Sequence, residues 1–190
     1  MGVPRKAVQK AMLLVGALYC DAAYLEKAEK ALASEFGKIF YETGPGDWHS
    51  EYYRDELGWP IKRVFLFFDI LIDPGLLADI KLLTNRLEAD FFSGPGSRRM
   101  INLDPGYITP AKLVLASTKD YSHRVYLGKG IFAEVTLMYS ARKKTFVPHT
   151  YTYRDFKDAA NVLAFNEMRQ ALMERLGLSG KGKREVRHVS

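Results

Sequence analysis

The sequence predicts an α+β fold with a ferredoxin-like βαββαβ core. Two apolar, strand-like runs are each followed by an amphipathic helical stretch and a further strand. The segments therefore follow the order strand, helix, strand, strand, helix, strand, which is the order of the split βαβ unit. Shorter strand-like segments and a last amphipathic stretch come after this core. We expect them to add a C-terminal β-hairpin or meander and a closing long helix.

The first strand and helix are predicted from an apolar run and a capped, amphipathic stretch. Residues 11–19 are continuously apolar, as in a strand that is buried on both faces. Asp21 is placed to cap a helix, and apolar residues recur after it every three or four positions. Gly37 favours the helix end, because glycine accepts the left-handed conformation of a C-cap. Residues 39–41 begin the second strand.

The second half of the core repeats this strand-and-helix pattern. A long loop rich in glycine and aromatic residues is expected over 44–60, followed by a strand over 63–70. Asp73 followed by Pro74 predicts the start of the second helix, since proline is favoured at the first helical position. The fourth strand is expected over 100–103.

The C-terminal part is predicted to add one short helix, a meander and one long helix. The short helix is expected over 110–117, because Pro110 can begin a helix. Strands over 123–127 and 131–139 are predicted to form a hairpin around two glycines, and 145–147 returns as a third strand. An amphipathic pattern over 155–177 predicts the closing helix.

The composition favours one domain and a cytoplasmic protein. The chain has 190 residues, 47% of them hydrophobic, which suits a single α+β domain over 1–178. Residues 179–190 read as a basic, flexible tail, and the last ten residues carry three of the six net positive charges. A single cysteine, Cys20, suits a reducing compartment. No apolar run approaches the ~20 residues that span a bilayer, so we expect no membrane partner.

Three side chains near the fourth strand and the hairpin are candidate catalytic residues. Asp104 follows the strand, where a loop can present it to a ligand. Glu134 lies in the middle of an apolar strand, where a buried carboxylate needs a cation, a metal or a proton. His123 could ligate a divalent metal together with these carboxylates.

Each of these residues also has a purely structural interpretation. Asp104 with Pro105 and Gly106 is typical of a turn. Glu134 can form a cross-strand ion pair with Arg124, and His123 lacks the spacing of metal-binding motifs. These interpretations remain open at the level of sequence.

A basic set in the same segment predicts anion binding. The candidate ligand-binding residues are Asn102, Lys112, Lys119, Arg124 and Lys129. Tyrosines are interleaved with the cations, a combination that suits a phosphorylated small molecule, a nucleotide or single-stranded nucleic acid. The expected helix at Pro110 would add free N–H groups and the positive end of its dipole. Solvated surface lysines are the alternative.

Long stretches of the chain resemble one uncharacterised family. The central run INLDPGYITPAKLVLASTKDYSHRVYLGKGIFAEVTLMY, with VGALYCD, LIDPGLLADIKLLTNRLE and YTYRDF elsewhere, resembles the prokaryotic domain of unknown function numbered 4416. The resemblance covers about 13–176. It implies no established activity, ligand or catalytic residue, although some members are labelled GTP-binding proteins. This sequence lacks the G-x-x-x-x-G-K-[S/T] loop that cradles phosphates, so it does not favour a GTPase.

Three functions follow as hypotheses. The first is a cytoplasmic protein that binds a phosphorylated or nucleotide-like anion through its basic set. The second is a metal-dependent hydrolase or transferase that uses Asp104, His123 and Glu134 with a divalent metal. The third is a non-catalytic interaction module, RNA-associated through the basic tail and an open sheet face. The sequence predicts neither the oligomeric state nor a specific cofactor.

Overall fold

A computed structural model describes residues 8–48, 53–91 and 99–178 of the chain. The strands are β1 (Ala11–Tyr19), β2 (Ile39–Glu42), β3 (Gly46–Asp47), β4 (Lys62–Ile72), β5 (Ile101–Ile108), β6 (Lys112–Ser117), β7 (Val125–Gly128), β8 (Ile131–Ser140) and β9 (Thr145–Pro148). The helices are α1 (Ala22–Phe36), α2 (Arg54–Leu57), the 3-10 turn η2 (Pro74–Leu76), α3 (Leu77–Asp90), α4 (Arg154–Lys157) and α5 (Ala159–Arg175). The predicted basic tail lies outside the described residues.

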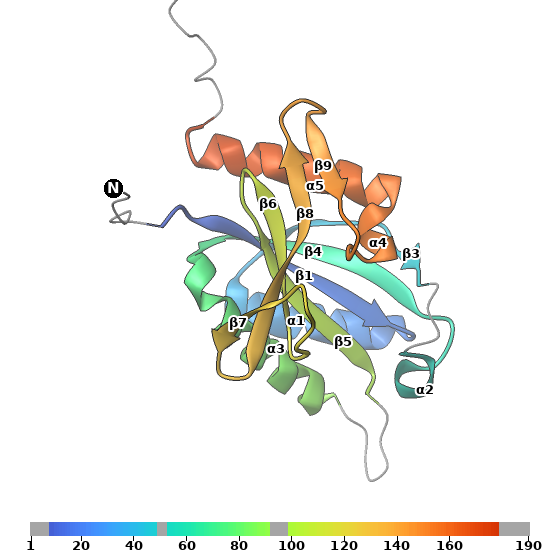
Figure 1. Cartoon of the computed structure of the whole chain (residues 1–190). Helices are drawn as coiled ribbons and strands as arrows, with labels where there is room; N and C mark the ends of the chain where they lie inside the picture. The colour runs from blue at the N-terminus through green and yellow to red at the C-terminus, as the bar shows by residue number, and fades with distance from the viewer. Residues whose placement is uncertain (1–7, 49–52, 92–98, 179–190) are drawn as a thin grey trace, which may run out of the picture.

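All strands of the described part belong to one antiparallel sheet, so the predicted α+β class is confirmed. The strand order is β2-β4-β1-β5-β6-β8-β7, with β3 added beside β4 and β9 beside β8. Helices α1 and α3 cover one face of the sheet and α5 covers the other, as Figure 1 shows. The sheet is therefore the middle layer of three.

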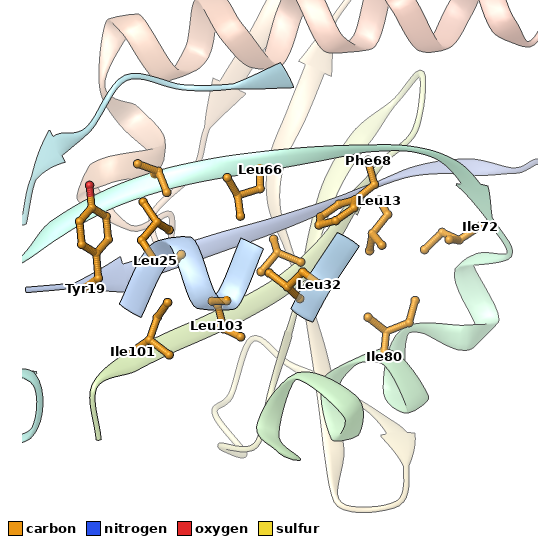
Figure 2. Close-up of a cluster of buried hydrophobic side chains, with 14 of the residues drawn as sticks. Leu13, Tyr19, Leu25, Leu32, Leu66, Phe68, Ile72, Ile80, Ile101 and Leu103 are labelled. Atoms are coloured by element: carbon orange, nitrogen blue, oxygen red, sulfur yellow. The ribbon is translucent and has the colours of Figure 1, made fainter. Parts of the chain in front are cut away.

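The strand β1 is apolar throughout because both of its faces are covered. Leu13 and Val15 point to the core under α1 and α3, while Met12 and Leu14 point to the core under α5. Figure 2 shows the first of these cores, where Leu32 of α1 lies among the strand side chains. Each fully buried side chain of this size contributes roughly 1.5–3 kcal/mol relative to exposure.

The core under α5 is built around packed phenylalanines. Phe65 of β4 contacts Phe156 of α4 edge-on with ring centroids 4.8 Å apart, and Phe165 of α5 at 5.0 Å. Phe156 and Phe165 stack on each other at 5.6 Å. These contacts fix α4 and the start of α5 against the middle of β4.

The fourth core strand is longer than predicted. Residues 104–106 form no turn; they continue β5, and Asp104 lies opposite Gly16 of β1. Gly106 is needed there, because a Cβ would lie 2.4 Å from the carbonyl oxygen of Val114 on the neighbouring strand β6. The turn prediction was wrong because this Asp-Pro-Gly sequence serves a close approach of two strands.

The short helix predicted over 110–117 is also wrong, since this segment is mostly strand β6. Leu113 and Leu115 point to one core, whereas Val114 and Ala116 point to another. A strand buried on both faces gives a continuous apolar run, which periodicity cannot separate from a buried helix. The side chain of Thr109 accepts the N–H groups of Ala111 and Lys112 and closes a hairpin turn instead.

The remaining C-terminal elements agree largely with the prediction. The hairpin of β7 and β8 turns at Gly128, Lys129 and Gly130, which all have positive φ, and β9 returns beside β8. The closing helix is divided into α4 and α5, because Asp158 is extended and its side chain caps α5 at Ala160. In the described residues, no helix combines the length and apolarity needed to cross a membrane.

Candidate functional site

The candidate site lies where the sheet opens between β5 and β6. β5 pairs with β1 from Ile101 to Ile108, but it pairs with β6 only from Gly106 to Ile108. Beyond Gly106, β6 continues beside β8 and leaves the first half of β5 without a strand on that side. The two strands therefore move apart as they leave the turn that joins them, and we call the space between them the wedge.

Side chains of α3 bind the backbone that β6 leaves free. The Leu103 N–H donates to Glu88 Oε1 at 2.7 Å, and Lys81 Nζ donates to the Leu103 carbonyl at 2.8 Å. Lys81 and Glu88 are seven residues apart and so lie on one face of α3. A buried backbone group without a hydrogen-bond partner destabilises the fold. These two charged side chains replace the hydrogen bonds that a neighbouring strand would form with Leu103.

The wedge encloses a cavity of about 660 Å³, a size typical of small-molecule sites. Aromatic side chains on its wall are Trp48, Tyr53, Tyr121, Tyr153 and Phe156. The cationic ones are Arg63, Lys81, Arg99, Lys119, Arg124 and Arg154, and the acidic ones are Glu56, Glu88, Asp104 and Glu134. Six cations against four carboxylates leave the cavity with an excess of positive charge.

One wall of the cavity is a chain of alternating charges, which we call the ion-pair wall. It runs from Asp155 of α4 to Glu56 of α2 through Arg63, Asp104, Lys81, Glu88 and Arg99. Successive nitrogen–oxygen distances along it are 2.9, 3.3, 3.7, 3.9, 3.1 and 2.6 Å. The five inner charges each lie between two partners of the opposite sign, and Asp155 and Glu56 end the chain with one partner each. The wall ties together α2, α3, α4, β4 and β5.

The carboxyl groups of the ion-pair wall are not equivalent. Burial pushes the pKa of Asp104 upward, but Lys81, Arg63 and the hydrogen bond from Asn102 outweigh it and lower that pKa below its usual range. Burial raises the pKa of Glu88 and of Asp155 in spite of their cationic neighbours. Asp104 is also about a quarter exposed. It is therefore an ionised acceptor that this wall presents to the cavity.

The opposite wall, which we call the arginine wall, is built on Arg124 and Glu134. Arg124 Nε donates to Glu134 Oε2 at 2.7 Å, and both side chains are almost fully buried. The other guanidinium nitrogens donate to neutral oxygens: Ser117 Oγ at 2.6 Å, the Lys119 carbonyl at 2.9 Å and the Tyr153 hydroxyl at 2.5 Å. Burial raises the pKa of Tyr153 to about 12, so its hydroxyl stays protonated at neutral pH.

His123 supports the arginine wall from behind. Its Nε2 lies 2.9 Å from Glu134 Oε2, the same oxygen that Arg124 binds. The imidazole stacks on Tyr151 with ring centroids 4.3 Å apart and planes 4° apart. The histidine therefore fixes the carboxylate that orients the arginine.

The surplus of positive charge belongs to the arginine wall and the nearby start of α4. Glu134 is the carboxylate that lies among Lys119, Arg124 and Arg154 on this side of the cavity. The Arg154 side chain is exposed, and within the described part of the chain its guanidinium has no hydrogen bond or ion pair. An anion that enters the cavity would meet the Arg154 guanidinium here.

The structure brings together five of the sequence-predicted residues. Asn102, Asp104, Lys119, Arg124 and Glu134 all line the cavity, although they come from β5, β8 and the segment between β6 and β7. Their roles stay predictions.

The two other predicted lysines lie elsewhere. Lys112 is exposed at the start of β6, and Lys129 forms an exposed ion pair with Asp79. The helix dipole expected beside Asp104 is absent as well, because the predicted helix is strand β6. The candidate ligand-binding groups are therefore side chains, and not the N–H groups of a helix terminus.

The structure does not gather the proposed metal ligands. No group of three or more His, Cys, Asp or Glu side chains that could hold a metal ion occurs in residues 8–48, 53–91 and 99–178. Asp104 contacts Arg63 and Lys81, whereas His123 and Glu134 contact each other at the arginine wall. Asp104 and Glu134 are thus each paired with an arginine and do not share a site with each other.

Sequence reasoning missed Arg63, Lys81, Glu88 and Arg99. Two of them carried a signal, because Lys81 and Glu88 interrupt the buried side of an amphipathic helix. A sequence signal for Arg63 was present as well, because Gly16 lies in the middle of an apolar strand. A Cβ at Gly16 would lie 2.7 Å from Arg63 Nη1, so glycine makes room for the guanidinium.

Comparison with known proteins identifies the family of the chain. The family model described as Domain of unknown function (DUF4416) matches residues 9–172. The chain belongs to this family. The match confirms the resemblance seen in the sequence, and it covers both walls of the cavity. No curated protein and no solved structure matches the chain.

Proposed function

We propose that this protein binds a small phosphorylated or nucleotide-like anion in the cavity between β5 and β6. The observation that carries the proposal is the charge of the cavity, where six cationic side chains face four carboxylates. Arginines are suited to phosphate, because the planar guanidinium can donate two parallel hydrogen bonds.

In this proposal the anionic group lies at the arginine wall. Arg154 is exposed at the cavity and has no partner among the described residues. Arg124 is already oriented by Glu134 and Tyr153, so it loses little freedom on binding. Tyr121, whose ring lies 4.6 Å from the Arg124 guanidinium, adds an aromatic surface beside the cations.

The ion-pair wall supports the proposal with a hydrogen-bond acceptor. Asp104 is ionised and partly exposed, and Asn102 holds its Oδ2 at 2.7 Å. A carboxylate in this state accepts hydroxyl groups, which sugar phosphates carry next to their phosphate. Asp104 therefore favours a phosphorylated sugar or nucleotide over inorganic phosphate.

A thermal-unfolding screen tests the proposal. Inorganic pyrophosphate, ribose 5-phosphate and nucleoside 5′-monophosphates are added to the full chain, and a probe at 100 times its Kd should stabilise it by ~2.7 kcal/mol. Arg154→Ala should reduce the shift. Arg142→Ala, which removes an exposed arginine between β8 and β9, should leave the shift unchanged. If none of these probes raises the Tm of the parent chain, the proposal is wrong.

The two other functional hypotheses stay predictions. A metal-dependent hydrolase or transferase would need a ligand cluster that the described residues lack. An RNA-associated module would use the basic tail, which lies outside the described residues, and an open sheet face, but α1 and α3 cover one face of the core sheet and α5 covers the other. Neither is favoured by a specific contact of this structure.

We also infer that the first half of the chain is a ferredoxin-like unit in a single cytoplasmic domain. The strand order β2-β4-β1-β5, with α1 and α3 on one face, supports the ferredoxin-like assignment. A single sheet that runs through both halves supports one domain, which we place at residues 1–178. The lone Cys20 supports a reducing, cytoplasmic location.

A further inference from the structure

A second cavity adjoins the candidate site. It measures about 680 Å³ and lies between the segment 43–48 and the start of α5. Trp48, Arg63 and Arg154 line both cavities. The two cavities therefore lie next to each other and share these three side chains.

The second cavity has the opposite charge balance. Asp47, Asp155 and Asp158 line it, and its cationic side chains are the two arginines that it shares with the first cavity. Arg63 is already held between Asp104 and Asp155. The second cavity is therefore rich in acceptors and poor in charge that could hold a phosphate.

Buried polar side chains lie near the residues that the two cavities share. Trp48 Nε1, Arg63 Nε and the carboxylate oxygens of Asp155 are enclosed by the protein and lack an aligned hydrogen bond. Arg63 Nε and Asp155 Oδ2 are ion-pair partners at 2.9 Å. The carboxylates that the second cavity offers to a ligand are therefore the exposed ones of Asp47 and Asp158.

We propose that the two cavities form one elongated site for a phosphorylated molecule whose other end is a planar ring that carries an amino group. This inference rests on the proposed function and specifies its substrate class. The phosphate binds at the arginine wall of the first cavity, the ring passes Trp48, and its amino group faces the aspartates of the second cavity. Bases of every kind stack on aromatic side chains.

A phosphate in each cavity is the less favourable arrangement. Asp155 and Asp158 would repel a second anion, and the two arginines that could attract it are those already shared with the first cavity. A ring with hydrogen-bond donors instead matches the carboxylates and needs no additional positive charge.

Titration calorimetry with matched probes tests this inference. CMP carries an amino group where UMP carries a carbonyl oxygen, and ribose 5-phosphate carries no base. We expect CMP and AMP to bind the parent chain at least about tenfold more tightly than ribose 5-phosphate, because the base adds a stacking contact and donors. UMP should bind more weakly than CMP, since its carbonyl would face carboxylates.

Two variants on α5 separate the second cavity from the first. Ala160 lines the second cavity, whereas the preceding Ala159 is exposed and lines neither. Ala160→Trp should fill the second cavity and reduce CMP and AMP affinity to the level of ribose 5-phosphate. Ala159→Trp adds the same ring to the same turn and should leave all affinities unchanged.

The outcomes distinguish this inference from the proposed function. If ribose 5-phosphate binds as tightly as CMP and AMP, or if Ala160→Trp keeps the preference for the base, the two-cavity site is wrong and anion binding in the first cavity stands. If no probe binds, including pyrophosphate, both proposals are wrong. Binding of pyrophosphate and ribose 5-phosphate that Ala160→Trp abolishes would also overturn the inference, because it would place the phosphate in the second cavity.

Discussion

The two walls of the cavity use the same kinds of side chain in different ways. On the ion-pair wall, seven charged groups are each matched by a neighbour of opposite sign. On the arginine wall, Arg124 has one carboxylate and otherwise holds neutral oxygens. Charges compensated inside the protein contribute to its architecture, whereas Arg154, which is exposed at the cavity and has no partner among the described residues, remains available to a ligand. We therefore expect substitutions on the first wall to affect mainly stability and those on the second to affect mainly binding.

Removing Arg63 should have the largest effect on stability. Arg63→Met leaves Asp104 and the buried Asp155 without their shared cation, and breaking a buried pair in this way costs about 3–5 kcal/mol. Chemical denaturation measures the loss. The double variant Arg63→Met with Asp155→Asn should recover part of it, because one buried charge is then removed. A loss below about 1 kcal/mol would show that the ion-pair wall does not stabilise the fold.

Gly106 tests the point at which the two walls separate. In Gly106→Ala the new Cβ would lie 2.4 Å from the Val114 carbonyl oxygen and 2.7 Å from Leu115 Cδ2, so β5 and β6 must move apart. We expect a loss of about 2 kcal/mol in the free energy of unfolding, as for other overpacked sites. Gly44→Ala is the matched control, since a Cβ there meets no atom within 4 Å. Equal stability of both variants would contradict the close approach.

Arg124 should matter less for folding than Arg63, because its carboxylate has a second partner. Arg124→Met leaves Glu134 buried, but His123 Nε2 lies 2.9 Å from the same oxygen. We expect a loss of about 1–2 kcal/mol in the free energy of unfolding, because Glu134 keeps this second partner. The additional change His123→Phe should increase the loss, since it leaves the buried carboxylate without either partner. A loss as large as that of Arg63→Met would make the two walls equivalent in stability.

The pH dependence of stability should differ between the carboxyl groups of the ion-pair wall. The pKa of Asp155 is raised, so its contribution is present below the usual value of 3.8 and is lost as the pH rises through the higher folded value. Asp104 behaves in the opposite sense, because its pKa is lowered and its contribution is lost as the pH falls through the folded value.

Denaturation curves over a pH series measure this difference. In the parent chain, Asp155 should make stability decrease as the pH increases above 3.8, and Asp155→Asn should remove this decrease. Asp104 should make stability decrease as the pH falls below 3.8, and Asp104→Asn should remove that decrease. Asp69→Asn is a control, since this exposed carboxylate pairs with Arg175 at the surface. Identical profiles for the first two variants would contradict the assigned directions.

The smallest effect is expected from a predicted residue that lies outside both walls. Lys129→Ala breaks an ion pair with Asp79 in which both side chains are more than half exposed. Its free energy of unfolding should stay within about 0.5 kcal/mol of the parent, and its response to pyrophosphate should be unchanged. If Lys129→Ala clearly reduces the Tm shift caused by pyrophosphate, Lys129 takes part in binding after all.

The core could be predicted from sequence because its signals are local. The apolar run of β1 and the Asp caps of α1 and η2 depend on neighbours along the chain. The predictions over 104–106 and 110–117 were wrong because their structure depends on partners across the sheet. Gly106 is read as a turn residue until Val114 is known to lie beside it.

The candidate site was predictable where one segment supplies it. Asp104, Arg124 and Glu134 lie within about thirty residues, and polar side chains at the end of a strand and within a hairpin differ visibly from their apolar neighbours. Arg63, Lys81 and Arg99 belong to other elements and join the cavity through tertiary packing. Their signals, a glycine in a strand and charges on a buried helix side, indicate that a charged group is accommodated but do not identify its partner.

The bond between the Leu103 amide and Glu88 makes one backbone proton sensitive to the electrostatics of the cavity. Strand amides in a sheet are usually protected by a neutral carbonyl, whereas this one is held by a carboxyl group with a raised pKa. Its hydrogen exchange should accelerate when Glu88 takes up a proton, because a neutral carboxyl is a weaker acceptor. NMR can therefore follow the protonation of Glu88 through the hydrogen exchange of the Leu103 amide, without a label in the cavity.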